Sequence, residues 1–369
     1  MAGIYIHIPF CKQACHYCNF HFTTSLRYKN ELLTALLKET VLRKEYIENE
    51  EVETIYFGGG TPSLLKGEEI ARQLQLIGEQ YRIAAGSEIT LEANPDDITI
   101  EKLAEWKAAG INRLSIGVQS FFEEDLRWMN RAHSAVQALD NLKLAREQFD
   151  NISIDLIYGT PQLTDEKWDS NIDTAISLQI PHLSCYALTV EPKTALFKMI
   201  EQHRAENIDP EKQSAQFLHL MYRLENAGYE HYEISNFALP GHRSRHNSSY
   251  WKGKHYLGLG PSAHSFNGHS RQWNIANNRQ YIDAMNAGIT AFEKEELTPT
   301  QQLNERIMIA LRTMEGLPLD KLDETTKKKL LEDSRKFIDN GLLLNKNDSL
   351  VLTKEGRLLA DGIAGALFF

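Results

Sequence analysis

Residues 3–18 read GIYIHIPFCKQACHYC, an alternating apolar run followed directly by three cysteines. The alternation before Pro9 predicts a short β-strand that ends at the proline. The spacing C-x3-C-x2-C then places Cys11, Cys15 and Cys18 in the loop that leaves this strand. Thiols clustered in this way indicate a metal site rather than a disulfide framework in a reducing compartment.

The thiol pattern leaves two kinds of metal site open. Structural zinc sites pair two short cysteine knuckles or add two histidines, and no second knuckle follows here. Three thiolates from one loop suit a cubane iron–sulfur cluster with one iron left open. Soft thiolates bind zinc and iron–sulfur clusters alike, so a partial zinc site with a remote ligand is the alternative.

Length and charge exclude several classes of protein. The chain has 369 residues and a net charge of −10, which argues against a broad nucleic-acid-binding surface. No apolar run approaches the ~18 residues that a membrane span needs. The first residues have neither the cationic region nor the small-residue cleavage site of a signal peptide. We therefore expect a cytoplasmic protein with at most peripheral membrane contact and no nucleic-acid partner.

Strand-like and helix-like segments alternate over the first 234 residues. The predicted strands are 3–8, 52–57, 88–93, 113–118, 151–157, 183–189 and 230–234. The predicted helices are 28–48, 68–82, 99–109, 123–129, 135–149, 164–178 and 211–226. Such alternation predicts an α/β fold with a parallel sheet and right-handed crossovers, either a partial barrel or an open doubly wound sheet.

Glycine-rich and polar blocks follow the ends of successive strands. They are GGGTP (58–62), EANPD (92–96), GVQS (117–120) and DLIYGTP (155–161). Both architectures bind ligands at this edge. Because the blocks recur on many strands rather than at one switch point, we favour a partial barrel.

The alternation stops near residue 293. Helices are predicted at 301–313 and 325–340, a hairpin at 341–353 and a last helix from Lys354. We predict two domains, 1–292 and 293–369, of which the second is a small helical, winged α+β unit.

Six ordered blocks resemble one known family: YIHIPFC, GGGTPS, EANPD, SIGVQSF, DLIYGTP and HNSSYW at 246–251. The chain resembles the radical S-adenosylmethionine (SAM) proteins, and within them the oxygen-independent coproporphyrinogen III oxidase-like group. Within that group it is most similar to the haem chaperones. The resemblance covers nearly the whole chain. It implies a partial (β/α)6-7 TIM-like barrel with a small C-terminal domain, a [4Fe-4S] cluster, SAM and haem as cargo.

Two departures separate the chain from the true coproporphyrinogen dehydrogenases. Those enzymes carry a fourth cysteine two positions after the third, where this chain has Phe20. They also have a longer segment before the cluster, whereas only ten residues precede Cys11 here. Both differences favour the chaperone branch.

The resemblance implies roles for individual residues. Cys11, Cys15 and Cys18 would ligate the cluster. The positions that match SAM contacts are Tyr5, Tyr17, Gly59, Gly60, Thr61, Glu92, Gln119, Arg131 and Asp155. Glu92 and Asp155 are carboxylates in otherwise apolar strands, which need a polar or cationic partner when buried.

The HNSSYW block is the expected haem site. His246 is the expected iron ligand, since imidazole is a common axial ligand of haem. Asn247, Tyr250 and Trp251 complete the block, and the two aromatic rings can pack on a porphyrin. Four further histidines are alternative ligands: His242, His255, His264 and His269. Cys185 lies in an apolar strand and is expected in the core.

The resemblance implies a protein that binds haem and passes it to acceptor haemoproteins such as respiratory cytochromes. Oxidative decarboxylation of coproporphyrinogen III is the alternative, followed by another radical modification of a tetrapyrrole. The family resemblance also implies a homodimer.

Overall fold

The computed structural model describes all residues from Met1 to Phe369. Its centre is a 12-stranded sheet in the order β12-β11-β10-β9-β1-β2-β3-β4-β5-β6-β8-β7. The strands from β9 to β6 in this order run parallel. They are β9 (His255–Leu259), β1 (Ala2–Ile8), β2 (Val52–Gly59), β3 (Ile83–Ala93), β4 (Arg113–Gln119), β5 (Ile152–Tyr158) and β6 (His182–Ala187).

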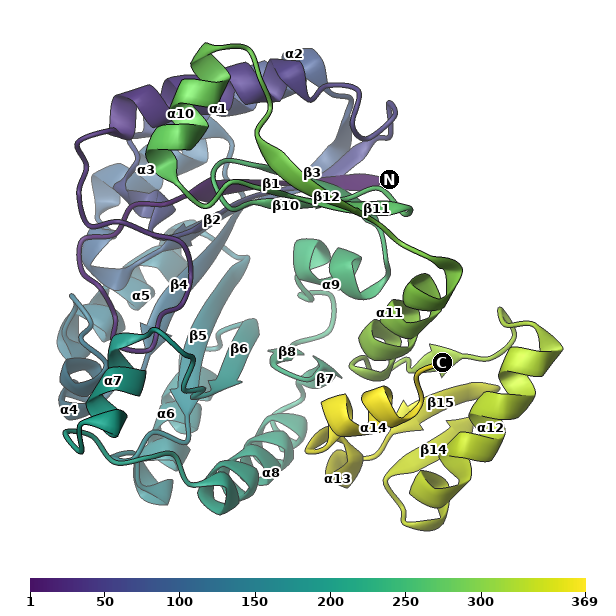
Figure 1. Cartoon of the computed structure of the whole chain (residues 1–369). Coiled ribbons are helices and arrows are strands. Elements are labelled where there is room, and N and C mark those ends of the chain that lie inside the picture. The colour runs from purple at the N-terminus through teal and green to yellow at the C-terminus, as the bar shows by residue number, and fades with distance from the viewer.

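Helices cover the convex face of this curved sheet (Figure 1). They are α1 (Lys29–Leu42), α2 (Gly67–Gln80), α3 (Ile100–Ala109), α4 (Glu123–Trp128), α5 (Ala135–Gln148), α6 (Asp165–Ser177), α7 (Ala195–Glu201), α8 (Pro210–Asn226) and α10 (Asn278–Asn286). One helix, α9 (Arg245–Trp251), lies instead on the concave side. Because the two outermost strands do not pair, the sheet is an open, partial barrel, which confirms the predicted fold class.

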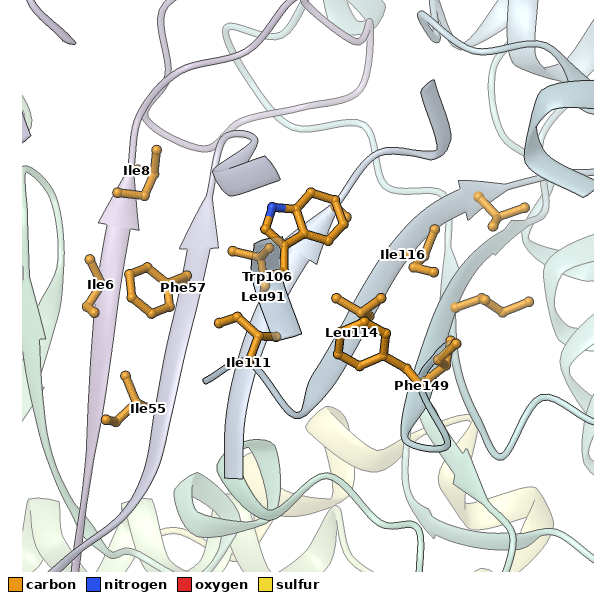
Figure 2. Close-up of a cluster of buried hydrophobic side chains, with 14 of the residues drawn as sticks. Ile6, Ile8, Ile55, Phe57, Leu91, Trp106, Ile111, Leu114, Ile116 and Phe149 are labelled. Carbon is orange, nitrogen blue, oxygen red and sulfur yellow. The ribbon is translucent and has the colours of Figure 1, made fainter. Parts of the chain in front are cut away.

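Alternation along each strand separates the core from the concave side. In β1, Ile4, Ile6 and Ile8 are fully buried, whereas Tyr5 and His7 point to the opposite face. Figure 2 shows Ile6 and Ile8 of β1 beside Ile55 and Phe57 of β2, and Trp106 of α3 beside Leu91 of β3. Each such aliphatic side chain stabilises the fold by about 1.5–3 kcal/mol. This core holds the strand ends in place.

Local sequence explains where most helices begin and end. The Thr99 hydroxyl accepts the Lys102 N–H at the start of α3, and Gly110 ends that helix with φ of 105°. The predicted helix 28–48 is shorter in the structure and ends at Leu42. The chain then turns toward β2, with positive φ at Glu48 and Asn49.

Antiparallel strands extend both ends of the sheet. On one side lie β8 (Asn236–Ala238) and β7 (Glu230–Glu233); on the other lie β10 (His264–Phe266), β11 (Ser270–Asn274) and β12 (Phe292–Glu296). The predicted strand at 230–234 therefore exists, but it pairs antiparallel with β8 instead of parallel with a strand of the barrel. The large sheet continues to Glu296, four residues beyond the predicted domain boundary.

The C-terminal part has its own small core. It contains α11 (Pro299–Leu311), β13 (Leu317–Pro318), α12 (Glu324–Asp339), β14 (Leu343–Lys346), β15 (Ser349–Leu352), α13 (Lys354–Arg357) and α14 (Ala360–Ala366). Asn347 and Asp348 both have positive φ, as a two-residue hairpin turn requires. The predicted helices and hairpin are confirmed. None of the helices in the chain combines the length and apolarity that crossing a membrane requires.

Candidate functional site

The three-cysteine loop leaves the carboxyl end of β1 and is held closed at its base. The Cys11 N–H donates to the Thr23 carbonyl at 3.0 Å, and the Thr23 N–H donates to the Pro9 carbonyl at 2.8 Å. The far side of the loop is tied to the segment after α4, where the His16 N–H donates to the Met129 carbonyl at 3.1 Å. The loop is therefore a fixed feature of the sheet edge.

The thiols of Cys11, Cys15 and Cys18 are partly exposed and form no disulfide. Burial raises the pKa of Cys11 to about 11 and also raises the pKa of Cys18. No three His, Cys, Asp or Glu side chains converge on a single point, as one bound metal ion would require. Thiolates are the usual ligands of iron–sulfur clusters, so the three side chains suit such a cluster by their chemistry.

Arg131 connects the loop to the neighbouring strand ends. Its Nη1 donates to Cys15 Sγ at 3.2 Å, and its Nη2 donates to Asn94 Oδ1 and the Gly117 carbonyl, each at 2.8 Å. The Nε of Arg131 is buried without a hydrogen-bond partner. This cation beside the thiols suits an anionic cluster or a carboxylate.

The end of β2 packs directly against the base of the cysteine loop. A Cβ at Gly60 would lie 2.7 Å from the Phe10 carbonyl oxygen and 2.9 Å from that of Ile8, so only glycine fits. The Gly60 N–H donates to the Ile8 carbonyl at 2.9 Å. Thr61, the next residue, is buried and accepts the Asn94 amide at 3.3 Å. The glycine-rich segment therefore fixes the distance between β2 and the loop.

Two carboxylates from β3 and β5 face the same concave space. Glu92 accepts the Tyr56 hydroxyl at 2.8 Å and the Gly59 N–H at 3.1 Å, and it pairs with no cation. Burial raises the pKa of Glu92 to about 7 and that of Asp155 to about 6, and the charge of Asp155 raises the pKa of Glu92 further. A ligand that carries an ammonium group or hydroxyls would supply the missing donors.

Gln119 leaves an unsatisfied polar atom at this edge. Its φ is +64°, an uncommon and strained value for a residue with a side chain. Its Oε1 is buried and has no hydrogen-bond partner. With the unpartnered Arg131 Nε, it leaves a donor and an acceptor for a zwitterion such as the methionyl part of SAM. The residues present therefore fit this cofactor.

The remaining predicted SAM residues lie at the same edge. Tyr5 points to the concave side, and its hydroxyl lies 3.1 Å from His7 Nδ1. Tyr17 is partly buried near Arg131 and Cys15, and burial raises its pKa. Gly59 has φ of 111° and packs on the His7 ring. The fold thus brings together all nine residues that the sequence predicted for SAM.

His246, the expected haem ligand, is buried and held by hydrogen bonds in this structure. It is 1% exposed, its Nδ1 lies 2.8 Å from Thr54 Oγ1 and its Nε2 lies 2.8 Å from the Tyr250 hydroxyl. Burial, with a smaller effect of Arg113, lowers its pKa to about 3. Both ring nitrogens are occupied, so His246 cannot ligate iron while α9 stays in this position.

The other HNSSYW residues also lie toward the amino ends of the barrel strands, which we call the lower half of the barrel. Ser244 caps α9 by accepting the Asn247 N–H at 3.2 Å. The Tyr250 ring meets the Tyr256 ring edge-on, with centroids 4.7 Å apart. Trp251 lies under the Arg312 guanidinium at 5.4 Å, and its indole N–H is buried without a partner. The block links the barrel to the C-terminal domain.

The sequence reasoning missed several residues that organise the site. Asn94 joins Thr61 to Arg131, and Tyr56 holds Glu92. Glu88 accepts the N–H groups of Arg245 and His246 at 3.1 and 3.0 Å and so holds the start of α9. Asn94 stood inside the quoted EANPD block, and Tyr56 alternates toward the concave side with Thr54. Those two signals were present in the sequence.

Comparison with known sequences gives matches over most of the chain. The radical SAM superfamily matches residues 5–175, and the HemN C-terminal domain matches residues 297–359. The heme chaperone HemW of Bacillus subtilis (strain 168) is 35% identical over 99% of this chain and 99% of its own length. A mitochondrial radical S-adenosyl methionine domain-containing protein 1 from Bos taurus is 32% identical over 98% of this chain and 86% of its own length.

A solved structure shares the whole fold. Coproporphyrinogen III oxidase (HemN) from Escherichia coli, described as a radical SAM enzyme, superposes with a TM-score of 0.83 at 25% identity. The match covers 100% of this chain and 90% of that chain.

Proposed function

Because the chain belongs to the heme chaperone HemW family of radical SAM proteins, we propose that it binds haem and transfers it to acceptor haemoproteins. In this proposal Cys11, Cys15 and Cys18 hold a [4Fe-4S] cluster and SAM binds beside it. When bound, the cluster and SAM would supply reductive radical chemistry or a structural switch.

The observation that carries the proposal is a set of polar groups without partners at the carboxyl ends of β1 to β5. The groups that lie together there are three free thiols, Arg131 Nε and Gln119 Oε1 without hydrogen-bond partners, and Glu92 without a cationic partner. Arg131 would bind the SAM carboxylate, and Glu92 and Asp155 would accept hydrogen bonds from its donors. Tyr5, Tyr17, Gly59, Gly60 and Thr61 would shape the remaining walls.

Haem would bind on the concave side, where two histidines compete as its ligand. His246 with Asn247, Tyr250 and Trp251 would reach the iron only after α9 leaves its position. His264 is exposed, makes no side-chain hydrogen bond and lies beside the Trp273 ring, with centroids 6.2 Å apart. Arg43, the residue after α1, donates to Gln272 at 2.8 Å, which places Gln272 on the helix side of β11. The next residue, Trp273, and its partner His264 on β10 therefore face away from the helices. We therefore propose His264 as the haem ligand as long as α9 keeps its present position.

Decarboxylation of coproporphyrinogen III is the second candidate function, favoured by the likeness to the Escherichia coli enzyme over the full chain. Against it stands Phe20, which is 67% exposed where the fourth cysteine of the dehydrogenases would be.

The partners that follow are haem and acceptor haemoproteins such as respiratory cytochromes, and we expect a homodimer. The three cysteines must stay reduced to hold the cluster, so we expect the protein to work in the cytoplasm with at most peripheral membrane contact.

The test uses anaerobically reconstituted protein titrated with haem and followed at the Soret band. Wild type, His264→Ala and His246→Phe are compared, and SAM, reductant and coproporphyrinogen III are supplied in parallel. Haem binding without formation of protoporphyrinogen supports the chaperone. Turnover to protoporphyrinogen would overturn it and assign the protein to the decarboxylases.

A loss of haem affinity in His264→Ala alone identifies His264 as the ligand. A loss in His246→Phe alone would instead require α9 to open during loading.

A further inference from the structure

Three aromatic rings connect α9 to the edge that carries the cofactor residues. The His246 ring stacks on Tyr56 with centroids 4.9 Å apart and planes 24° apart. Tyr56 stacks in turn on Tyr5, with centroids at 6.1 Å and the same interplanar angle. Tyr5 and His246 also face each other at 6.5 Å. The position of His246 therefore limits where the Tyr56 ring can lie.

His246 itself has little freedom. Its two ring nitrogens bind the hydroxyls of Thr54 and Tyr250, and its backbone N–H donates to buried Glu88. A Cβ at Gly3 would lie 2.8 Å from Thr54 Oγ1 and 3.4 Å from His246 Cε1, so β1 leaves room for this pair only because residue 3 is glycine. The imidazole acts as a fixed wall beneath Tyr56.

Tyr56 passes this constraint to Glu92. Its hydroxyl donates to Glu92 Oε1 at 2.8 Å, while Glu92 Oε2 accepts the Gly59 N–H at 3.1 Å. A displaced Tyr56 ring would release one of the two hydrogen bonds that orient this carboxylate. Glu92 has no cation to hold it otherwise.

We propose that His246 is a positioning residue of the SAM site: packed against Tyr56, it orients Glu92 for the ligand. The inference rests on the proposed SAM site at Glu92. It assigns the HNSSYW helix a second role, coupling the position of α9 to SAM binding. Because coupling between two sites is reciprocal, bound SAM in turn stabilises the docked α9.

His182 provides a matched control within the same barrel. It is fully buried, its Nδ1 lies 2.6 Å from Ser153 Oγ and its Nε2 lies 2.7 Å from the Tyr232 hydroxyl. Burial lowers its pKa, as it does for His246. Its ring packs on Tyr232, which makes no hydrogen bond to Glu92. Loss of either imidazole removes two contacts with hydroxyl groups, but only His246 lies beneath Tyr56.

The experiment measures the SAM dissociation constant of anaerobically reconstituted protein by equilibrium dialysis. The variants are Tyr56→Phe, His246→Phe, the double variant and His182→Phe, each checked for cluster content and melting temperature. We expect His246→Phe and Tyr56→Phe each to weaken SAM binding about tenfold. The double variant should bind SAM at most about twofold more weakly than either single variant, because both substitutions act through one contact. His182→Phe should stay within about twofold of wild type.

Three outcomes would overturn the inference: normal SAM binding in His246→Phe, multiplied effects in the double variant, or an equal loss in His182→Phe. If wild type itself fails to bind SAM, the proposed function fails first. Hydrogen exchange of residues 245–251 in wild type needs no variant and must slow when SAM is added; unchanged exchange contradicts the coupling.

Discussion

The carboxyl edge of the barrel and its lower half differ in how their buried polar side chains are partnered. At the carboxyl edge, Arg131 and Gln119 keep unpartnered polar atoms, and Glu92 has no counter-charge. In the lower half, His182 and His246 have both ring nitrogens occupied. Arg113 and Trp251 are exceptions: Nε and Nη1 of Arg113 lack hydrogen bonds although Glu88 lies 3.7 Å away, and the indole N–H of Trp251 has no partner.

This difference separates ligand binding from scaffold. A buried polar group without a hydrogen-bond partner lowers the stability of the protein. Such groups are retained where a bound ligand supplies the partner. Polar groups with every partner inside the protein hold elements together. Changes at the carboxyl edge should therefore alter ligand binding, and changes in the lower half should alter stability or act indirectly.

The largest effect is expected for Cys11→Ser. Loss of one of three thiolates should abolish the stable [4Fe-4S] cluster, because no fourth cysteine stands nearby to replace it. Iron content and the visible absorption of the reconstituted protein measure this loss. Cys185→Ser is the matched control, since Cys185 is 1% exposed in β6 and should leave the cluster intact. An intact cluster in Cys11→Ser would assign the iron to other ligands.

Glu88→Gln tests the lower half and should mainly reduce stability. Glu88 accepts two N–H groups of α9 and faces Arg113, so its loss leaves a buried cation without a counter-charge. We expect a loss of about 3 kcal/mol in unfolding free energy, measured by chemical denaturation. Glu53→Gln, which removes a partly exposed pair with Lys254, should cost less than about 1 kcal/mol. Equal losses of unfolding free energy in the two variants would contradict the distinction between the buried Glu88 and the surface ion pair.

Arg131→Gln should leave the fold intact and weaken SAM binding by a factor of about 30, or about 2 kcal/mol. The substitution removes the contacts of the guanidinium with Cys15 and Asn94, and it removes the positive charge that would bind the SAM carboxylate. Equilibrium dialysis measures the affinity. Arg127→Gln on exposed α4 is the control, and wild-type affinity in Arg131→Gln would remove this residue from the site.

The smallest effect is a pH dependence of SAM binding. Burial holds the pKa of Glu92 at about 7 and that of Asp155 at about 6, so both carboxylates ionise as the pH rises through this range. SAM affinity should rise about threefold to tenfold between pH 6 and pH 8, because only ionised carboxylates accept from every donor. Glu92→Gln should flatten the profile; an unchanged profile would exclude Glu92.

The stability of the ligand-free protein should change in the opposite direction. A carboxyl group whose pKa is raised by folding favours the folded state at low pH, and that contribution is lost as the pH rises through its folded pKa. The unfolding free energy should therefore fall by about 4 kcal/mol from about pH 5 to pH 8, and by less in Glu92→Gln.

The carboxyl edge was predictable because its chemistry sits in short motifs at strand ends. The cysteine spacing and the blocks GGGTP, EANPD and GVQS each follow a strand whose alternation is visible in the sequence. Parallel strands necessarily bring these ends together.

The lower half was not predictable in the same way. Nothing in residues 244–251 reveals that Glu88, Thr54 and Tyr56 lie opposite, so the burial of His246 could not be predicted from the sequence. Those partners come from β2 and β3, more than 150 residues earlier in the chain. The strands β8 to β11 have only three to five residues, too few for a periodic signal.

The central claim is that this protein carries haem and delivers it. The direct measurement loads the reconstituted protein with haem, removes free haem by gel filtration and mixes the complex with an excess of an apo-cytochrome. The account predicts that the Soret spectrum shifts from that of the loaded protein to that of the holo-cytochrome, and that the cytochrome regains activity. A stable haem complex that never releases its cargo, or protein that retains no haem, would contradict the account.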